Sequence, residues 1–423
     1  MPPLSIAYIR EKWQHAGFQK YFRNMGWAFG ARGFSLVMSF FVGTYVARYL
    51  GPQRYGVLNY VLSFVTIFAF LASFGIDSIL VRDLIKYKDK EKEVLNTAFT
   101  LKLIGGISVV LISIISSILI KNDIYTTLLI FIYSIQLLLG AFNVTDYYFQ
   151  SIVKYKYSSI AQVISTIAVS LLKLFLVYKG FGTGWFIFAL IFEGIVSTVI
   201  LLRFFLREGQ RVRFSLNKDI GKKMIADSWP FILSSAFYLI YTKIDQVMIG
   251  KMIDTTSLGI YAAGVKIAEI WYFIPAIICG VMLPAIINAK VKDHTLYKTR
   301  IKKLFLLIIG LSFIIALFEF VFAKYLILML FGKAYTGSIV ILQIYTWAGI
   351  IVSAVMVAQQ YLITENKTKV IMGSSFFGAL INVMLNLILI PKFGIMGSAW
   401  ATVISYSTIP VIIFISLKVK KLN

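Results

Sequence analysis

The chain has 423 residues, 59% of them hydrophobic, and its mean hydropathy is +0.83. A soluble domain uses roughly 45–50% apolar residues, so this composition excludes an ordinary soluble protein. The net charge of +24 comes from 42 Lys and Arg residues against 18 Asp and Glu. These basic residues are dispersed over short segments between apolar runs, whereas a nucleic-acid-binding surface would gather them in one patch. No nucleic-acid partner is expected.

Twelve apolar stretches fill most of the chain, and a stretch of ~20 such residues crosses the ~30 Å hydrocarbon core of a bilayer as a helix. Ahead of the first stretch, apolar residues recur at helical spacing in the basic segment 1–25, which predicts a helix lying on the membrane surface. The predicted fold is all-α and integral to the membrane, with spans near 26–50, 57–81, 94–120, 124–149, 158–178, 181–202, 225–250, 258–288, 304–331, 336–363, 370–390 and 394–417.

Lys and Arg gather in alternate connecting segments, such as 82–93, 203–223 and 289–303, and are scarce in the segments between. Because Lys- and Arg-rich loops stay in the cytoplasm, both termini are expected there. The longest and most basic loop separates the spans six and six. We therefore expect a cytoplasmic surface segment at 1–25, an N-terminal lobe at 26–202, a basic inter-lobe loop at 203–224, a C-terminal lobe at 225–417 and a cytoplasmic tail at 418–423.

Landmarks recur in the two halves. Gly56 near the start of the second span is matched by Gly259 at the start of the eighth, 203 positions later. Phe181-Gly182 and Phe393-Gly394 open the last span of each half. Two matched pairs in the same order indicate two parallel repeats of six spans, and such repeats commonly enclose a substrate site at their interface. This organisation predicts a transporter.

Charged residues at membrane depth are costly and mark cavities or buried partners. The first half contains three deep cations and one deep anion, Glu193. This excess of positive charge favours an anionic ligand. Lys266 and Glu269 are three apart on one helix and can pair, so a structural couple remains open for them. The candidate substrate-binding cations are Arg32, Lys102, Lys173, Lys243 and Lys266, and the candidate ion-coupling carboxylates are Glu193, Asp245, Glu269 and Glu319.

Signals for catalysis are weak. His15 and His294 have no metal-ligand spacing, and no phosphate-binding glycine loop is present. The single cysteine, Cys279, excludes an internal disulfide and a cysteine-cluster metal site. We expect no enzymatic activity, no cofactor and no metal. A membrane glycan polymerase or ligase is disfavoured, because it would display a sizeable outer loop and the predicted outer loops are short.

Several motifs are similar to those of a known family. The string Tyr45-Val46-Ala47-Arg48-Tyr49-Leu50-Gly51-Pro52 resembles the start of Wzx-type polysaccharide flippases, which share a superfamily with the MATE exporters and the lipid II flippases. Later landmarks of that family are similar to Phe74-Gly75-Ile76-Asp77 with Arg82, to Asp245-Gln246-Val247-Met248-Ile249-Gly250, and to Pro391-Lys392-Phe393-Gly394-Ile395-Met396-Gly397-Ser398. The resemblance covers essentially the whole chain.

The resemblance implies two six-helix lobes arranged as a V around a central cavity. It implies a substrate that is an undecaprenyl-pyrophosphate-linked oligosaccharide, such as an O-antigen or exopolysaccharide repeat unit, carried to the outer leaflet of a bacterial inner membrane. The implied partners are this lipid-linked substrate, membrane lipids and the polysaccharide polymerase machinery, and a monomer suffices. Arg32 lies in the first helix, where related flippases carry a cavity arginine. A MATE-like exporter of small organic cations is the alternative, which would need unpaired acidic residues deep in a lobe.

Overall fold

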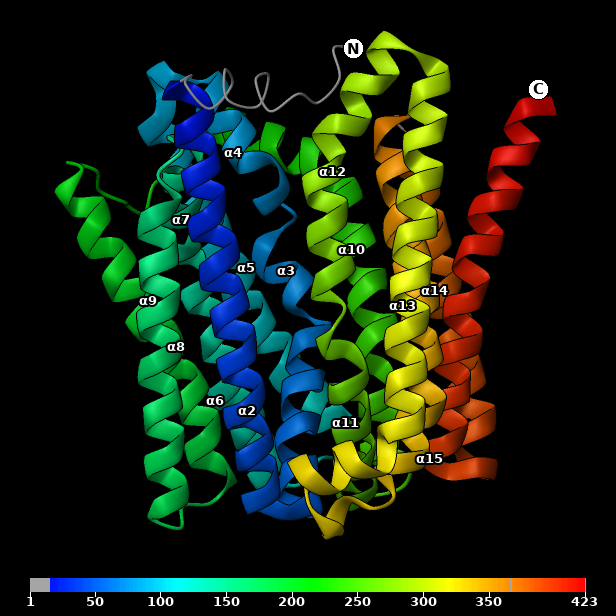
Figure 1. Cartoon of the computed structure of the whole chain (residues 1–423). Helices are drawn as coiled ribbons and strands as arrows, with labels where there is room; N and C mark the ends of the chain where they lie inside the picture. Colours follow the sequence, from blue (N-terminus) through cyan, green and yellow to red (C-terminus); the bar gives the residue numbers. More distant parts are fainter. Residues whose placement is uncertain (1–15, 366, 423) are drawn as a thin grey trace. The chain divides into compact units, whose positions relative to one another are not determined.

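The computed structural model describes residues 16–365 and 367–422 (Figure 1), so residues 1–15 of the predicted surface segment lie outside the described residues. All regular elements in the described ranges are helical, which confirms the predicted all-α class. The longer helices are α2 (Ala16–Ile67), α5 (Glu91–Leu119), α6 (Ile124–Leu139), α8 (Tyr155–Tyr178), α9 (Thr183–Arg207), α10 (Lys218–Met252), α11 (Thr255–Ile270), α12 (Phe273–Lys292), α13 (His294–Leu330), α14 (Ser338–Thr364) and α15 (Thr368–Leu422). The short ones are α3 (Ala69–Ser73), α4 (Asp77–Lys86) and α7 (Val144–Ser151), with 3₁₀ turns η1 (Lys88–Lys90), η2 (Gly140–Asn143) and η3 (Lys333–Tyr335).

Nine segments within the described ranges are long and apolar enough to cross a membrane, and the chain is a multi-pass membrane protein. Two of them, Gly26–Ile67 and Lys369–Ser416, have 42 and 48 residues, about twice the ~20 that one crossing needs. Each contains a glycine in the left-handed region, Gly51 with φ 70° and Gly394 with φ 58°. Because glycine adopts this conformation without steric cost, the helix breaks there, and each long segment is divided into two helical parts.

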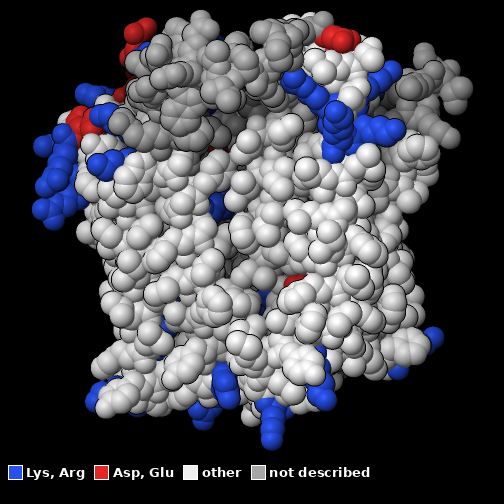
Figure 2. Space-filling view, viewed as in Figure 1, with Lys and Arg blue, Asp and Glu red and all other residues white. Residues whose placement is uncertain are grey.

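Charged side chains are unevenly distributed along the helices. On the face shown in Figure 2, Lys and Arg side chains gather towards the ends of the helices, and the middle parts carry almost none. Many large apolar side chains of the described helices are exposed, among them Leu171, Ile314 and Val321 at 59–65% exposure. Exposed apolar side chains suit contact with lipid, because the hydrocarbon core of a bilayer contains no water.

The predicted span 57–81 is not one continuous helix. It is divided among the end of α2, α3 and the start of α4, with φ values of 45° at Phe74 and 63° at Gly75. The break leaves the Phe74 carbonyl outside the helical hydrogen-bond pattern, and Ser228 Oγ donates to that oxygen at 2.8 Å. A hydroxyl from another helix thus satisfies a backbone group that would be costly to leave unpaired at this depth.

The chain divides into two compact units. The first consists of Leu71–Ile115, Phe131–Trp229 and the described part of Met1–Gly43. The second consists of Thr44–Phe70, Ser116–Ile130 and the described part of Pro230–Asn423. The predicted lobe boundaries at 26–202 and 225–417 remain predictions.

In the first unit, the basic loop after α9 is fixed along α5. The Ser215 amide donates to Thr100 Oγ1 and its carbonyl accepts from the same hydroxyl, both at 3.1 Å. The Asn217 amide donates to Thr97 Oγ1 at 3.2 Å. The segment between α9 and α10 therefore belongs to the packed body of the first unit, although its composition is that of a solvated loop.

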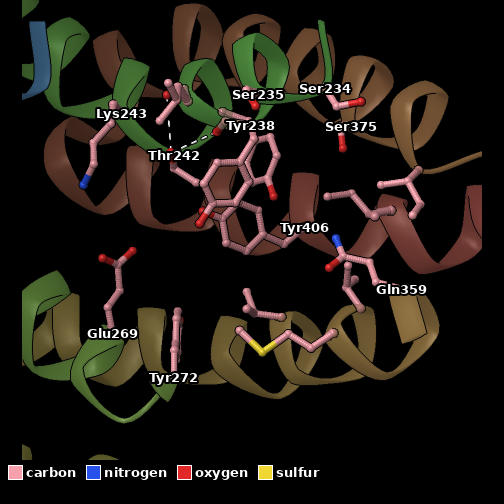
Figure 3. Close-up of a pocket in the computed structure, with 17 residues that line it drawn as sticks. Ser234, Ser235, Tyr238, Thr242, Lys243, Glu269, Tyr272, Gln359, Ser375 and Tyr406 are labelled. Carbon is pink, nitrogen blue, oxygen red and sulfur yellow. Dashed lines mark hydrogen bonds between the residues drawn. The ribbon is translucent and has the colours of Figure 1, made fainter. Parts of the chain in front are cut away.

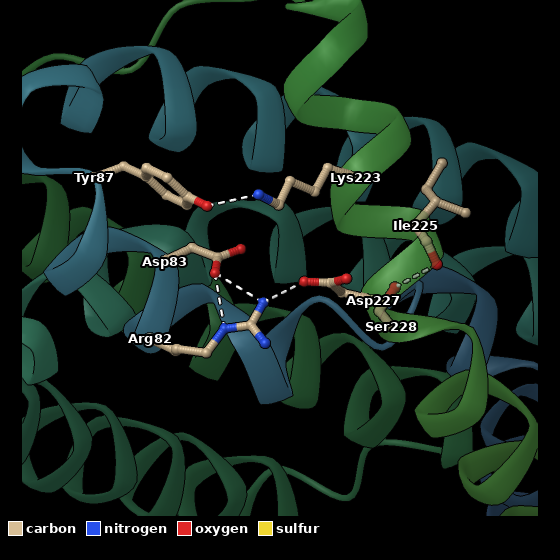
Figure 4. Close-up of polar contacts among 7 residues, drawn as sticks. All are labelled: Arg82, Asp83, Tyr87, Lys223, Ile225, Asp227 and Ser228. Atoms are coloured by element: carbon tan, nitrogen blue, oxygen red, sulfur yellow. Dashed lines mark hydrogen bonds and ion pairs between the residues drawn. The ribbon is translucent and has the colours of Figure 1, made fainter.

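A charged cluster holds the end of α4 against the start of α10 (Figure 4). The Arg82 guanidinium lies between two carboxylates, with Nε 2.9 Å from Asp83 Oδ1 and Nη2 2.6 Å from Asp227 Oδ2. Hydrogen bonds to Asp83 and Asp227 raise the pKa of Arg82 above its ordinary value. Beside it, Lys223 Nζ donates to the Tyr87 hydroxyl at 2.7 Å. Arg82, one of the motif residues, thus acts as an anchor between two helices.

In the second unit, α2 beyond its break and α11 cross at two glycines. A Cβ on Gly56 would lie 1.6 Å from the Thr255 carbonyl oxygen, and a Cβ on Gly259 would lie 1.9 Å from the Pro52 carbonyl oxygen. Thr255 follows Pro52 by the same 203 positions that separate the two glycines. The contact of Gly56 with Thr255 and the contact of Gly259 with Pro52 therefore join corresponding pairs of residues, as expected of two copies of one repeat related by a two-fold axis.

Candidate substrate cavity

A cavity of about 600 Å³ lies in the second unit, among α10, α11, α14 and α15 (Figure 3). This volume is within the range of ~300–1,000 Å³ that small-molecule sites occupy. The polar lining residues are Ser234, Ser235, Tyr238, Tyr241, Thr242, Lys243, Glu269, Tyr272, Gln359, Ser375 and Tyr406. Two predicted site residues, Lys243 and Glu269, are brought together in this lining.

The α10 side of the cavity follows from the sequence pattern of that helix. Ser234, Tyr238, Tyr241 and Thr242 recur at three- or four-residue steps and so share one face of the helix. Thr242 Oγ1 donates to the Tyr238 carbonyl at 2.9 Å, which keeps its hydrogen bond within the helix. This uncharged polar face is not among the features predicted from the sequence. The signal that could have found it is the periodicity of hydroxyl-bearing residues within 225–250.

Aromatic rings are the largest part of the polar lining. Tyr241 meets Tyr238 and Tyr406 edge to face, with ring centroids 5.3 Å apart in both pairs. The Tyr272 hydroxyl is buried and finds no hydrogen-bond partner within the described ranges. On the same side, Glu269 Oε1 accepts a hydrogen bond from the Tyr345 hydroxyl at 2.9 Å. The cavity therefore offers flat ring faces, hydroxyl groups and one carboxylate.

Asp245 lies next to the cavity in a buried polar cluster. Its side chain accepts hydrogen bonds from the Tyr261 hydroxyl at 2.5 Å and from the Gln246 amide at 2.7 Å. Ser398 and Thr402 of α15 come within hydrogen-bonding reach of the same Tyr261 hydroxyl. Asp245 is 1% exposed, and the partners named here are uncharged.

The cluster extends along α15. Ser398 Oγ donates to Asn386 Oδ1 at 2.7 Å, and Asn382 Nδ2 donates to Ser405 Oγ at 3.1 Å. All four of these side chains are buried. Together with Asp245 they form a set of oxygen-bearing groups inside one unit of the membrane-embedded fold.

The other predicted residues of the second unit have separate surroundings. Glu319 is 4% exposed and accepts hydrogen bonds from Thr346 Oγ1 at 2.6 Å and from Trp271 Nε1 at 3.2 Å. Lys266 Nζ lies 5.9 Å from the ring centroid of Tyr55. Neither Glu319 nor Lys266 lines the cavity.

In the first unit, two of the three deep cations lie beside acidic residues of other elements. Lys102 Nζ is 2.5 Å from Asp77 Oδ1, and the Lys102 side chain is 3% exposed. Lys173 of α8 and Glu193 of α9 are electrostatic neighbours. Arg32 is exposed on α2, and within the described ranges it forms no ion pair. Of the three deep cations of the first half, Arg32 is thus the exposed one with no ion pair in the described ranges, and its role in binding remains a prediction.

Two curated proteins match this chain at similar sequence identity. One is a probable flippase, AglR, of Haloferax volcanii, 26% identical over 256 residues, which is 59% of this chain and 52% of that protein. The other is an uncharacterised membrane protein of Methanocaldococcus jannaschii, 27% identical over 212 residues, which is 49% of this chain and 48% of that protein. The chain spans about half the length of the curated relatives it matches.

Solved structures share the fold. An inward-facing multidrug resistance MATE family transporter of the MOP superfamily superposes with a TM-score of 0.75 at 13% identity, covering 90% of this chain and 94% of that one. The lipid II flippase MurJ in an inward closed conformation superposes with a TM-score of 0.74 at 16% identity, covering 92% and 86%. At these identities the likeness establishes the fold alone.

Family sequence profiles match both halves. The MatE profile matches residues 230–388, and the profile described as polysaccharide biosynthesis protein matches residues 21–290, which is more than half of the chain. The resemblance drawn from the motifs is thereby confirmed: the chain belongs to the polysaccharide biosynthesis protein family.

Proposed function

We propose that this protein is a flippase that carries a lipid-linked oligosaccharide from the cytoplasmic to the outer leaflet by alternating access. The observation that carries the proposal is the family match over residues 21–290. It is supported by a polar cavity of about 600 Å³ within a bundle of apolar helices. A glycan head group cannot cross hydrocarbon without polar partners, because each unsatisfied polar group there costs several kcal/mol.

The finer features of the proposal are those implied by the family resemblance, together with the span count and orientation expected from the loop charges. The carrier lipid is undecaprenyl pyrophosphate, the membrane is a bacterial inner membrane, and the chain crosses it twelve times with both termini cytoplasmic. Arg32 contacts the pyrophosphate, since a guanidinium group donates strong hydrogen bonds to phosphate oxygens. The polymerase machinery receives the translocated unit.

Deletion of the gene tests this proposal. The expected result is loss of one surface polysaccharide, with its lipid-linked repeat unit retained on the cytoplasmic side. The measurement combines surface glycan analysis with the accessibility of the lipid-linked intermediate to an enzyme added outside spheroplasts. A strain that keeps its full set of surface glycans and accumulates no intermediate would contradict the proposal.

A second candidate is a MATE-like exporter of small organic cations. It is favoured by the MatE match over residues 230–388 and by Glu269 among tyrosines, since aromatic faces and a carboxylate attract cations. Lys243 in the same lining opposes it. The deletion strain distinguishes the two, because an exporter predicts increased sensitivity to cationic dyes with unchanged glycan.

Asp245 is proposed as the residue that couples transport to an ion. It is buried among oxygen-bearing side chains, and loss of its charge removes the attraction for a cation while Asn preserves its shape. Because coupling free energies of ~1–3 kcal/mol correspond to ~5–150-fold, Asp245→Asn is expected to lower glycan export by a factor in that range. Export is measured in the deletion strain complemented with each variant at equal protein level.

The matched control is Asp254→Asn. Asp254 caps α11 by accepting from the Ser257 amide at 2.7 Å, and Asn caps a helix about equally well. This variant is expected to export normally. Unchanged export in Asp245→Asn would refute the coupling role, and a similar loss in both variants would point to a general effect on folding.

A further inference from the structure

We infer that the cavity of the second unit binds uncharged sugar rings of the transported glycan, so that its tyrosines contribute to glycan specificity. This inference rests on the proposed flippase function and assigns one part of the substrate to one cavity. It leaves the pyrophosphate to cations elsewhere.

The charge of the lining favours an uncharged ligand. Of the described residues that line the cavity, Lys243 and Glu269 are the two with charged side chains, and their charges are opposite. A pyrophosphate needs an excess of cations, and an organic cation needs an excess of anions. A sugar ring needs neither, because it is recognised through hydroxyl groups and ring faces.

The chemistry of the lining matches both surfaces of a sugar ring. Four tyrosines, Tyr238, Tyr241, Tyr272 and Tyr406, provide apolar faces on which the C–H face of a sugar can pack, and hydroxyl groups that can form hydrogen bonds with a ligand. Ser235 and Ser375 lie in the same lining (Figure 3) and can donate to or accept from the ring hydroxyls. A sugar ring needs both kinds of group, since its C–H face packs on aromatic rings and its hydroxyl groups bind small polar side chains.

A second observation points to a ligand. The Tyr272 hydroxyl is buried against the cavity and has no hydrogen-bond partner within the described ranges. A buried hydroxyl without a hydrogen-bond partner is costly. A ligand hydroxyl that forms a hydrogen bond with the Tyr272 hydroxyl would remove this cost and so bind more tightly. Tyr272 belongs to the turn between α11 and α12, whereas Tyr238 and Tyr406 come from α10 and α15. A ligand that reaches all three would contact three separate elements.

Site-specific photo-crosslinking tests the inference. Tyr238 is replaced by photoreactive benzoylphenylalanine in the full chain, expressed in the deletion strain, and the adducts are analysed by tandem mass spectrometry for sugar fragment ions. Tyr325 of α13 is the matched control, because it is 71% exposed and does not line the cavity. We expect sugar-bearing adducts at position 238 and at least about tenfold fewer at position 325.

The outcomes separate this inference from the proposed function. Adducts at position 238 that carry only a polyprenyl chain, or no sugar at all, would overturn the sugar assignment. If deletion blocks export and position 238 captures no sugar, this inference alone fails; if deletion leaves export unchanged, the flippase function fails first. Crosslinking of position 238 to an added cationic dye, with a matching loss of any glycan adducts, would also overturn the sugar assignment.

A functional variant provides a second readout. Tyr238 is 52% exposed, so Tyr238→Ala is expected to insert and fold, and loss of one stacking ring lowers glycan export by about three- to tenfold. Tyr325→Ala removes a ring of the same type outside the cavity and is expected to export normally. Equal export by the two variants would contradict a role for the cavity ring.

Discussion

Gly56→Ala is expected to destabilise the protein strongly and to lose glycan export. The added Cβ would lie 1.6 Å from the Thr255 carbonyl oxygen, so α2 and α11 would have to separate by well over an ångström. Overpacking of a tight contact costs typically ~1–3 kcal/mol and occasionally more, and a backbone atom cannot rotate away as a side chain can. The free energy of unfolding in detergent, measured by chemical denaturation, is expected to fall by about 3 kcal/mol.

Gly259→Ala provides an internal repeat of the same experiment, because its Cβ would lie 1.9 Å from the Pro52 carbonyl oxygen. The two variants are expected to lose similar amounts of stability. Gly310→Ala of α13 is the matched control, since beyond the adjacent residues and the nearby backbone of its own helix no atom lies within 4 Å of its Cβ position. That variant is expected to be neutral or stabilised by ~0.5–1 kcal/mol, because Ala is the better helix former. Two crossing variants as stable as Gly310→Ala would refute this packing.

Asp77→Asn is also expected to cost a large amount of stability. It would leave the Lys102 ammonium, on a side chain 3% exposed, without its carboxylate partner at 2.5 Å. Removing one partner of a buried ion pair costs ~3–5 kcal/mol. Lys102→Met should cost less, because the Asp77 side chain is 34% exposed and can be hydrated. The double variant is expected to be more stable than Asp77→Asn alone, as a double-mutant cycle in detergent would measure.

Arg32→Ala is the matched contrast to this pair. Arg32 is exposed, so its loss is expected to leave the free energy of unfolding within about 0.5 kcal/mol. Its export is expected to fall roughly 10–100-fold, since a hydrogen bond to a charged group contributes ~1.5–3 kcal/mol. Additive effects of Asp77→Asn and Lys102→Met would contradict the ion pair. Normal export by Arg32→Ala would remove the proposed pyrophosphate contact.

The candidate site was only partly predictable. Lys243 and Glu269 could be singled out because a charge in an apolar run is visible in the sequence. Tyr272 and Tyr406 could not, because aromatic residues are common in membrane helices and nothing local marks those that line a cavity. The Lys102–Asp77 pair was also missed, since its members are 25 positions apart and lie on different helices.

The sequence by itself determined that this protein is helical and embedded in a membrane, because hydrophobic length and backbone hydrogen bonding leave few other solutions there. The sequence also determined where two long helices break, because the breaks lie at glycines, Gly51 and Gly394, which adopt a positive φ. Tertiary structure alone decided which charges are neutralised and which polar faces enclose a cavity. Those properties depend on distances between helices, and the sequence records only distances along the chain.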